Sequence, residues 1–323
     1  MKAAVLYQPG GPENFELEER PIPRPIEGQI LIKVKAFGLN RSELMTRKGF
    51  SPSVKFPRVL GIECVGEVQE DPSGEFKKGQ RVAAFMGGMG RDYDGSYAEY
   101  TVIPKQLIFP FESNLSWDKL GAMPEMFQTV YGSLHLALKI QEGETILIRG
   151  GTSSIGMLAV QLAKQSGLKV LATTRNPAKQ ALLLNNGADH VLIDDGSLIA
   201  KVKALYPEGV DKTLELIGTS TLYDSMHCAA QFGTVCMTGM LSEQWSVSDF
   251  APMEFIPATV HLTIYDSGQI RVEGKHFQQF IRDVEAARVH LNVNRTYSLE
   301  DIAEAHRTME NNAGAGKIVV LTN

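Results

Sequence analysis

The sequence predicts an α/β protein in which a β-rich lobe accompanies a doubly wound parallel sheet. Three observations lead to this prediction. At 323 residues the chain exceeds one ordinary core, so two domains of roughly 100–200 residues are expected. Short strands separated by glycine and proline fill residues 1–115. Strands then alternate regularly with helices over residues 145–238, which is typical of a parallel sheet.

The β-rich lobe is expected to use residues from both ends of the chain. The N-terminal MKAAVLYQPGG predicts an edge strand that ends in a turn, and further strands are expected at 30–36, 63–68 and 82–85. The last part of the chain predicts a helix at 275–289, a helix that begins with a capping box at Ser298 and Asp301, and a strand at 317–321. Many short strands and frequent turns favour a partly barrel-like lobe.

Residues 145–238 contain the alternation that predicts the parallel sheet. Pro177 suits the first turn of a helix, and Gly187 suits the position after its last turn. We expect strands at 145–148, 168–173, 190–193, 212–217 and 234–237, and further helices at 155–166, 197–205 and 220–231.

The segment TILIRGGTSSIG, residues 145–156, is the most informative stretch of the sequence. Gly151 and Gly156 match glycines of the pattern G-x-G-x-x-G, while Ser153 takes its middle position. In a Rossmann fold such a strand–turn–helix unit presents backbone N–H groups to a pyrophosphate. We therefore predict dinucleotide binding, with a tight turn that holds no ligand as the alternative. The expected contacts are Gly151, Thr152, Ser153, Ser154, Ile155 and Gly156.

The end of the second predicted strand indicates which dinucleotide binds. An NAD site carries an acidic residue about 20 positions after the glycine turn. Thr174 stands 18 positions after Gly156 and is followed by Arg175, so the acid is absent. A guanidinium suits a 2′-phosphate because it offers a charged, planar fork of donors. We therefore predict NADPH, and the alternative makes Arg175 an ordinary solvated residue.

Two later strand ends are candidates for the nicotinamide end of the cofactor. Ligands of open α/β sheets bind just beyond the carboxyl ends of the strands. Contacts to the nicotinamide ribose are therefore expected from Ile217, Gly218, Thr238, Gly239 and Met240.

Composition and charge exclude several classes of partner. A net charge of −5 provides no basic stripe for nucleic acid. No run of about 18 apolar residues predicts a membrane span. The N-terminus lacks the apolar core of a signal peptide, and three cysteines without CxxC spacing suit a reducing compartment. We expect a cytoplasmic protein that acts on a small molecule.

Motifs spread over nearly the whole chain resemble the medium-chain dehydrogenase/reductase superfamily, and most closely its zinc-free, quinone oxidoreductase-like branch. They are MKAAVLYQPGGPE, GLNRSELMTRKG, PRVLGIECVGEV, KKGQRVAAF, GSYAEYTVIP, LAVQLAK, GADHVLIDD and AHRTMENNAGAGKIVV. The resemblance implies a GroES-like catalytic domain formed by residues 1–118 and 258–323, and a Rossmann NADP-binding domain formed by residues 119–257. It also implies a homodimer in which the strand near 256–265 pairs with its mate.

The resemblance assigns roles to three further residues. Thr129 corresponds to a threonine that meets the nicotinamide carboxamide, although a hydroxyl bonded to its own helix is the alternative. Lys179 resembles a lysine that contacts the 2′-phosphate in some relatives, and Asn40 would face the nicotinamide. The chain departs from many relatives at Met45 and Asp194, where they carry tyrosine.

The superfamily's zinc ligands are changed in this chain. Its alcohol dehydrogenases use a cysteine after the first long strand and a Gly-His-Glu triplet. Here the cysteine position is Asn40 and the triplet is Gly61-Ile62-Glu63. Asparagine and isoleucine supply neither a thiolate nor an imidazole, so no metal is expected.

No Ser/His/Asp, Cys/His or paired-carboxylate arrangement is visible, which fits hydride transfer by a cofactor. Candidate partners of the substrate oxygen are Asn40 and Tyr97, with Arg41 and Ser42 beside the first. A structural role that caps a strand is the alternative for Tyr97. The leading hypothesis is an NADPH-dependent reductase of a quinone or an α,β-unsaturated carbonyl. A zinc-type alcohol dehydrogenase and a non-catalytic NADPH-binding sensor are the alternatives.

Overall fold

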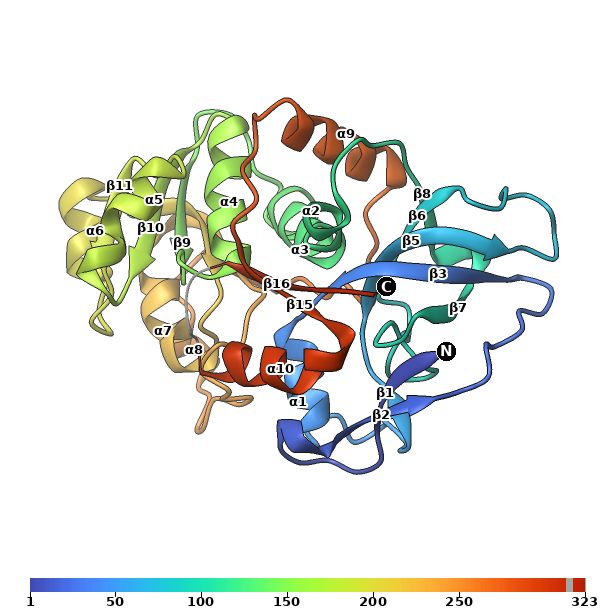
Figure 1. Ribbon diagram of the computed structural model, residues 1–323. Coiled ribbons are helices and arrows are strands. Elements are labelled where there is room, and N and C mark those ends of the chain that lie inside the picture. Colours follow the sequence, from blue (N-terminus) through green and yellow to red (C-terminus); the bar gives the residue numbers. More distant parts are fainter. Residues whose placement is uncertain (312–315, 323) are drawn as a thin grey trace. The chain divides into compact units, whose positions relative to one another are not determined.

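The computed structural model describes residues 1–311 and 316–322 (Figure 1). Contacts between Cα atoms divide the chain into two compact units. Unit 1 consists of Met1–Phe127 and Glu273–Asn323, and unit 2 consists of Gln128–Val272. The domain bounds expected from the sequence, 1–118 with 258–323 and 119–257, stay a prediction.

Unit 2 is built on a six-stranded sheet whose neighbours are all parallel. The strand order reverses beside the strand that precedes the glycine turn, which confirms the predicted doubly wound sheet. In spatial order the strands are β11 (His190–Ile193), β10 (Lys169–Thr174), β9 (Thr145–Arg149), β12 (Val210–Glu215), β13 (Ala229–Met237) and β14 (His261–Ile264).

The helices of unit 2 follow the predicted alternation. They are α4 (Ser154–Gln165), η4 (Pro177–Lys179), α5 (Gln180–Asn185), α6 (Ile199–Leu205), α7 (Thr219–His227) and α8 (Pro252–Phe255). The expected helix at 220–231 is too long by its last residues. Ala229 instead pairs with Val210, because β13 begins there and its backbone groups bond to β12 rather than to a helix.

Unit 1 contains two sheets (Figure 1). The larger runs β15 (Val293–Ser298), β16 (Lys317–Leu321), β3 (Gln29–Gly38), β5 (Glu63–Glu70), β6 (Arg81–Phe85) and β8 (Ile108–Pro110), while β7 (Tyr100–Pro104) pairs with β3. The smaller runs β2 (Phe15–Glu19), β1 (Lys2–Leu6) and β4 (Arg58–Val59). The expectation that the first strand is an edge strand is wrong. Residues 58–59, far along the chain, supply its second neighbour.

Short helices complete unit 1. They are η1 (Pro12–Asn14), α1 (Arg41–Arg47), η2 (Lys105–Leu107), α2 (Trp117–Gly121), α9 (Gly274–Glu285), η5 (Leu299–Asp301) and α10 (Ile302–Glu310). The predicted capping box is not formed. The Ser298 hydroxyl donates to the Asp301 carboxylate at 2.8 Å and accepts no backbone N–H. The helix α3 (Pro124–Tyr131) spans the boundary between the units in sequence, and the π-helical η3 (Gly132–Ala137) belongs to unit 2.

Each unit has its own apolar core. In unit 1 the core lies between β1, β3, β5, β6 and α10, and it contains Leu6, Ile32 and Val320. In unit 2, Leu147 and Leu171 on adjacent strands pack with residues of α6. No helix in the described part of the chain is long and apolar enough to cross a membrane.

Candidate cofactor and substrate sites

The glycine turn after β9 leaves no room for side chains. Gly150 has a φ of +88°, a conformation that favours glycine. A Cβ on Gly156 would lie 2.4 Å from the carbonyl oxygen of Gly150, and one on Gly151 would lie 3.0 Å from that of Thr173. The backbone of the turn therefore passes directly beneath the first turn of α4, which requires glycine at both motif positions.

The start of α4 presents free hydrogen-bond donors. Ser153 is the N-cap of α4, and its hydroxyl accepts the N–H of Gly156 at 3.0 Å and donates to Gly150 O at 2.8 Å. The N–H groups of Thr152, Ser154 and Ile155 have no hydrogen-bond partner among the described residues. Free donors at a helix N-terminus form an anion site. The Ser153 side chain shapes this site rather than lining it.

The end of β10 carries two cations without ion-pair partners. Arg175 is exposed and Lys179 is half-buried, and neither has a hydrogen bond or ion pair through its side chain in the described chain. The hydroxyl of Thr174 is already used, because it bonds the backbone of Asn176 at 3.1 and 3.2 Å. Thr174 is only 4% exposed. Its hydroxyl therefore stabilises the turn that presents Arg175.

One buried glutamate holds both strand ends expected at the nicotinamide ribose, one through its carboxylate and the other through its backbone carbonyl. Glu215, the last residue of β12, accepts the N–H groups of Ile217 at 2.7 Å and Gly218 at 3.1 Å through Oε1. Its carbonyl accepts the N–H groups of Thr238 at 3.0 Å and Gly239 at 3.1 Å. Sequence reasoning does not single out Glu215, because a carboxylate at the end of a strand is usually solvated.

Ser133, which was not predicted from the sequence, links Thr129 to the end of β13. The Ser133 hydroxyl bonds Thr129 O at 2.6 Å and Thr238 Oγ1 at 2.8 Å. Ser133 belongs to η3, and π-helical turns inside helices are frequent at functional sites. The predicted residues of unit 2 therefore share one edge of its sheet. Carboxyl ends of parallel strands always meet at one edge.

Asn40, in unit 1, is held by charged neighbours. Its Oδ1 accepts from Lys317 Nζ at 2.5 Å, and its Nδ2 donates to Glu63 Oε1 at 2.8 Å and Glu43 Oε1 at 3.3 Å. Lys317 also donates to Glu63 Oε1 at 2.7 Å, with both side chains almost completely buried. These contacts fix the orientation of the amide. Both Nδ2 hydrogens point to carboxylates, so Asn40 has no spare donor in this arrangement.

Glu43, next to Asn40 and Glu63, has one carboxylate oxygen without a hydrogen bond among the described residues. It is 1% exposed, and this oxygen is Oε2. Burial raises the pKa of Glu43 from 4.5 to about 8; Lys317 lowers it and Glu63 raises it further. The carboxyl group is therefore protonated at neutral pH, and two adjacent buried carboxylates do not both carry charge.

The structure accounts for Tyr97 as a core residue of unit 1. Tyr97 is 0% exposed, its ring stacks on Phe37 with centroids 4.7 Å apart, and its hydroxyl bonds His306 Nε2 at 3.0 Å. Burial also raises its pKa well above 10 and lowers the pKa of His306 to about 3. These contacts favour the structural alternative for Tyr97, and its catalytic role stays a prediction.

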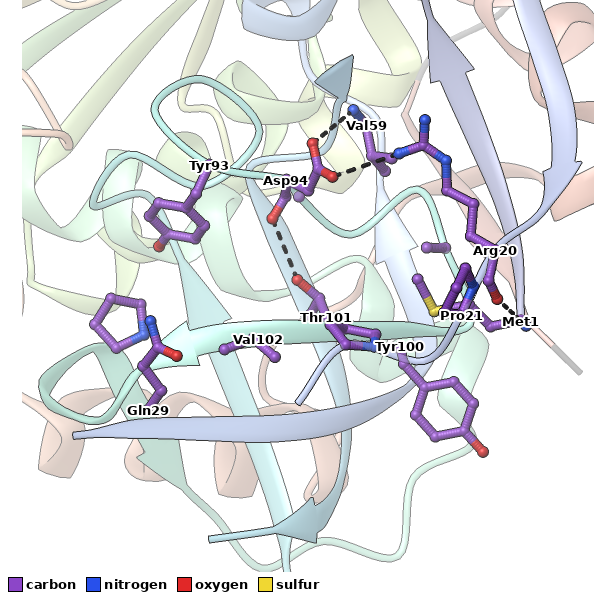
Figure 2. A pocket seen from close by; sticks show the side chains of 14 residues that line it. Met1, Arg20, Pro21, Gln29, Val59, Tyr93, Asp94, Tyr100, Thr101 and Val102 are labelled. Carbon is purple, nitrogen blue, oxygen red and sulfur yellow. Dashed lines mark hydrogen bonds and ion pairs between the residues drawn. The ribbon is translucent and has the colours of Figure 1, made fainter. Parts of the chain in front are cut away.

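A cavity of about 540 Å³ opens on another face of unit 1. It lies along β7 and the segment that contains Pro21 and Pro23. In Figure 2, Asp94 reaches the backbone of Val59 and the guanidinium of Arg20, so the charged groups of this cavity satisfy one another. None of the predicted site residues lines it.

Comparison with known proteins identifies the family. The model for the alcohol dehydrogenase GroES-like domain matches residues 26–113, and that for zinc-binding dehydrogenases matches residues 154–285. A quinone oxidoreductase from Homo sapiens is 27% identical over 332 aligned positions, which cover 99% of this chain and 98% of the relative. These matches and the fold show that the chain belongs to the medium-chain dehydrogenase/reductase superfamily, in its quinone oxidoreductase-like branch. It is an oxidoreductase of that type.

Two solved structures are similar over the whole chain. An NAD-dependent alcohol dehydrogenase has a TM-score of 0.89 at 25% identity and is covered, like this chain, over 100% of its length. A mycobacterial protein solved in complex with NADPH has a TM-score of 0.87 at 25% identity, with 99% of both chains covered. The GroES-like and Rossmann architecture predicted from the sequence is confirmed.

Replacing Glu43 by glutamine should change how stability depends on pH. Between pH 4.5 and about 8 the folded protein binds the Glu43 proton more tightly than the unfolded chain does. The free energy of unfolding therefore falls as pH rises through this interval. Glutamine does not titrate, so Glu43→Gln lacks this loss. From pH 5 to pH 8.5, the unfolding free energy of the variant minus that of the wild type should rise by an amount on the order of 2–4 kcal/mol. Urea unfolding at both pH values measures the difference.

Glu208→Gln is the matched control, because Glu208 is exposed and has no partner in the described chain. Its pH dependence should equal that of the wild type. Parallel curves for Glu43→Gln and wild type would show that Glu43 is ionised in the folded protein.

Proposed function

We propose that the protein transfers a hydride from NADPH to a quinone or an α,β-unsaturated carbonyl without zinc. The observation that carries the proposal is the set of unpaired N–H groups of Thr152, Ser154 and Ile155 at the start of α4. They lie where a Rossmann fold holds a pyrophosphate, and the turn can pack against the start of α4 only because Gly156 has no Cβ, which would lie 2.4 Å from Gly150 O. The residues present therefore fit a dinucleotide.

The preference for NADPH rests on the end of β10. Both an NAD-dependent enzyme and an NADPH complex are among the similar structures, so the fold by itself does not decide the cofactor. Here no carboxylate follows the strand where an NAD site would have one. The side chains of Arg175 and Lys179 have no hydrogen bond or ion pair with the described residues. These cations are suited to bind a 2′-phosphate, because charge-assisted hydrogen bonds to phosphate are strong.

The donor set does not fit a catalytic zinc. The Oδ1 of Asn40, at the family's cysteine position, already accepts the Lys317 ammonium, and Ile62 has no ligand atom. A second cation beside that ammonium would be repelled. No group of three His, Cys, Asp or Glu side chains among the described residues has metal-binding geometry. We therefore derive no step through a metal.

The substrate class follows from what these residues can supply. When bound, the nicotinamide provides the hydride. An ordinary aldehyde would need strong polarisation of its oxygen, and Asn40, whose two N–H groups are engaged, provides little. A quinone or conjugated carbonyl spreads the developing negative charge over its own atoms and needs less help. Asn40 stays the candidate contact to the substrate, with Lys317 and Glu63 holding its amide in one orientation.

NADPH oxidation should be observed with quinones and enones and should persist in a chelator. Rates are measured by absorbance at saturating NADPH against quinones, enones, enals, simple aldehydes and alcohols, with and without EDTA. Efficient oxidation of simple alcohols that is lost in EDTA would instead establish the zinc-type dehydrogenase. Tight NADPH binding without turnover of any acceptor would favour the non-catalytic sensor.

Arg175→Ala should weaken NADPH by roughly tenfold or more and leave NADH nearly unchanged, because only NADPH carries the 2′-phosphate. Fluorescence titration of each cofactor gives the dissociation constants. Lys203→Ala removes an exposed cation of α6 that has no side-chain partner in the described part of the chain, and it should change neither constant. Equal weakening of both cofactors by Arg175→Ala would show that the arginine is structural.

A homodimer formed through β14 is part of the proposal. β14 is the edge strand of the unit 2 sheet, and Ile264 on it is 59% exposed. Unpaired edges favour pairing with a second copy across a two-fold axis. Sedimentation equilibrium at micromolar protein should give twice the mass of one chain, and the mass of one chain would contradict the dimer. The cytoplasmic location stays a prediction.

A further inference from the structure

A buried arginine lies beneath the cofactor edge of unit 2 and contacts two carboxylates at once. Arg149, the last residue of β9, is 0% exposed. Its Nε and Nη2 donate to the two carboxylate oxygens of Asp194 at 2.8 and 2.9 Å, and its Nη1 donates to Asp224 Oδ2 at 2.7 Å. The fork of the guanidinium matches Asp194 in the bidentate geometry that is strongest for such pairs.

Asp194 lies next to the residue expected at the 2′-phosphate. It directly follows β11, and its backbone N–H donates to Thr174 O at 2.9 Å. Thr174 pairs with Ile193 in the parallel register of β10 and β11. Asp194 is thus an acidic group at the same strand ends as Arg175. A free carboxylate there would repel a second anion.

The side chain of Asp194 is engaged by partners inside unit 2. It is only 8% exposed, Arg149 donates to both of its carboxylate oxygens, and the N–H of Gly196 donates to Oδ1 at 3.0 Å. Burial opposes its ionisation, but the hydrogen bonds and charge of Arg149 outweigh burial and lower the pKa of Asp194. The carboxylate is charged, and the Arg149 guanidinium, which also contacts Asp224, offsets that charge inside the protein.

The charges that remain at the edge are therefore positive. Asp195 also has an internal partner, since Lys201 Nζ lies 2.6 Å from its Oδ2, although this pair is largely exposed and weak. The side chains of Arg175 and Lys179 have no ion-pair or hydrogen-bond partner among residues 1–311 and 316–322.

We infer that Arg149 determines cofactor choice from inside the protein, by holding Asp194 away from the site of the 2′-phosphate. Arg149 touches no cofactor in this account and is a positioning residue. The inference rests on the proposed function, because it requires that NADPH binds at this edge.

The experiment compares the ratio of the NADH and NADPH dissociation constants in four proteins. Arg149→Met frees the Asp194 carboxylate and should lower the preference for NADPH by roughly tenfold. Arg149→Met combined with Asp194→Asn removes the freed charge and should restore the wild-type ratio. Arg149→Lys keeps one positive charge but cannot form the bidentate pair, so it should give a smaller loss and remains informative if Arg149→Met does not fold.

The rescue separates this role from a merely structural one. Loss of packing alone would weaken both cofactors equally, and Asp194→Asn would not restore the ratio selectively. An unchanged ratio in Arg149→Met, or in Arg149→Lys where the first variant does not fold, would overturn the inference while the proposed function stands. A wild-type protein that does not prefer NADPH would instead overturn the proposed cofactor.

Discussion

The close approach of the glycine turn to the first turn of α4 is the constraint on which the cofactor site depends. Gly150 and Gly156 let the backbone double back directly after β9. Ser153 then closes the turn by capping Gly156. Because the cap satisfies one N–H and leaves three others without partners, the same local structure that starts the helix also creates the anion site. The other predicted cofactor residues of unit 2 lie along the same edge of the sheet.

In unit 2, one buried arginine is shared among several acidic residues near the strand ends. Arg149 bonds Asp194 and Asp224, while the Ser225 hydroxyl bonds both Arg149 and the Glu215 carboxylate. Burial raises the pKa of Glu215, and Ser225 and Arg149 partly offset this. Such groups are costly to bury and are usually retained where they fix a geometry. In this protein the buried charged groups hold the strand ends in place, and the cofactor is proposed to bind at those strand ends.

Local patterns were sufficient to predict the fold of unit 2. Strand and helix periods are written within a few residues, and the regular alternation leaves few topologies for a parallel sheet. Apart from the capping box at Ser298, the predictions that are wrong concern distant partners. The central position of β1 depends on residues 58–59, and the end of α7 depends on pairing of Ala229 with β12. Spacing along the chain carries no information about either contact.

The candidate site divides in the same way. The glycine turn and the Thr174–Arg175 pair could be found from motif spacing, because a single βαβ unit contains them. The contacts of Asn40 could not, since Lys317 lies 277 positions away in sequence. Tyr97 resembled a polar loop residue until its ring was placed in the core beside Phe37 and His306. Residue type alone did not distinguish a free hydroxyl from one that is enclosed.

A crystal structure of the NADPH complex tests the central claim most directly. The account predicts pyrophosphate oxygens within hydrogen-bond distance of the N–H groups of Thr152, Ser154 and Ile155, and a 2′-phosphate in contact with Arg175. The Asp194 carboxylate should remain on Arg149. A dinucleotide bound away from the start of α4, or a 2′-phosphate remote from Arg175, would contradict the account.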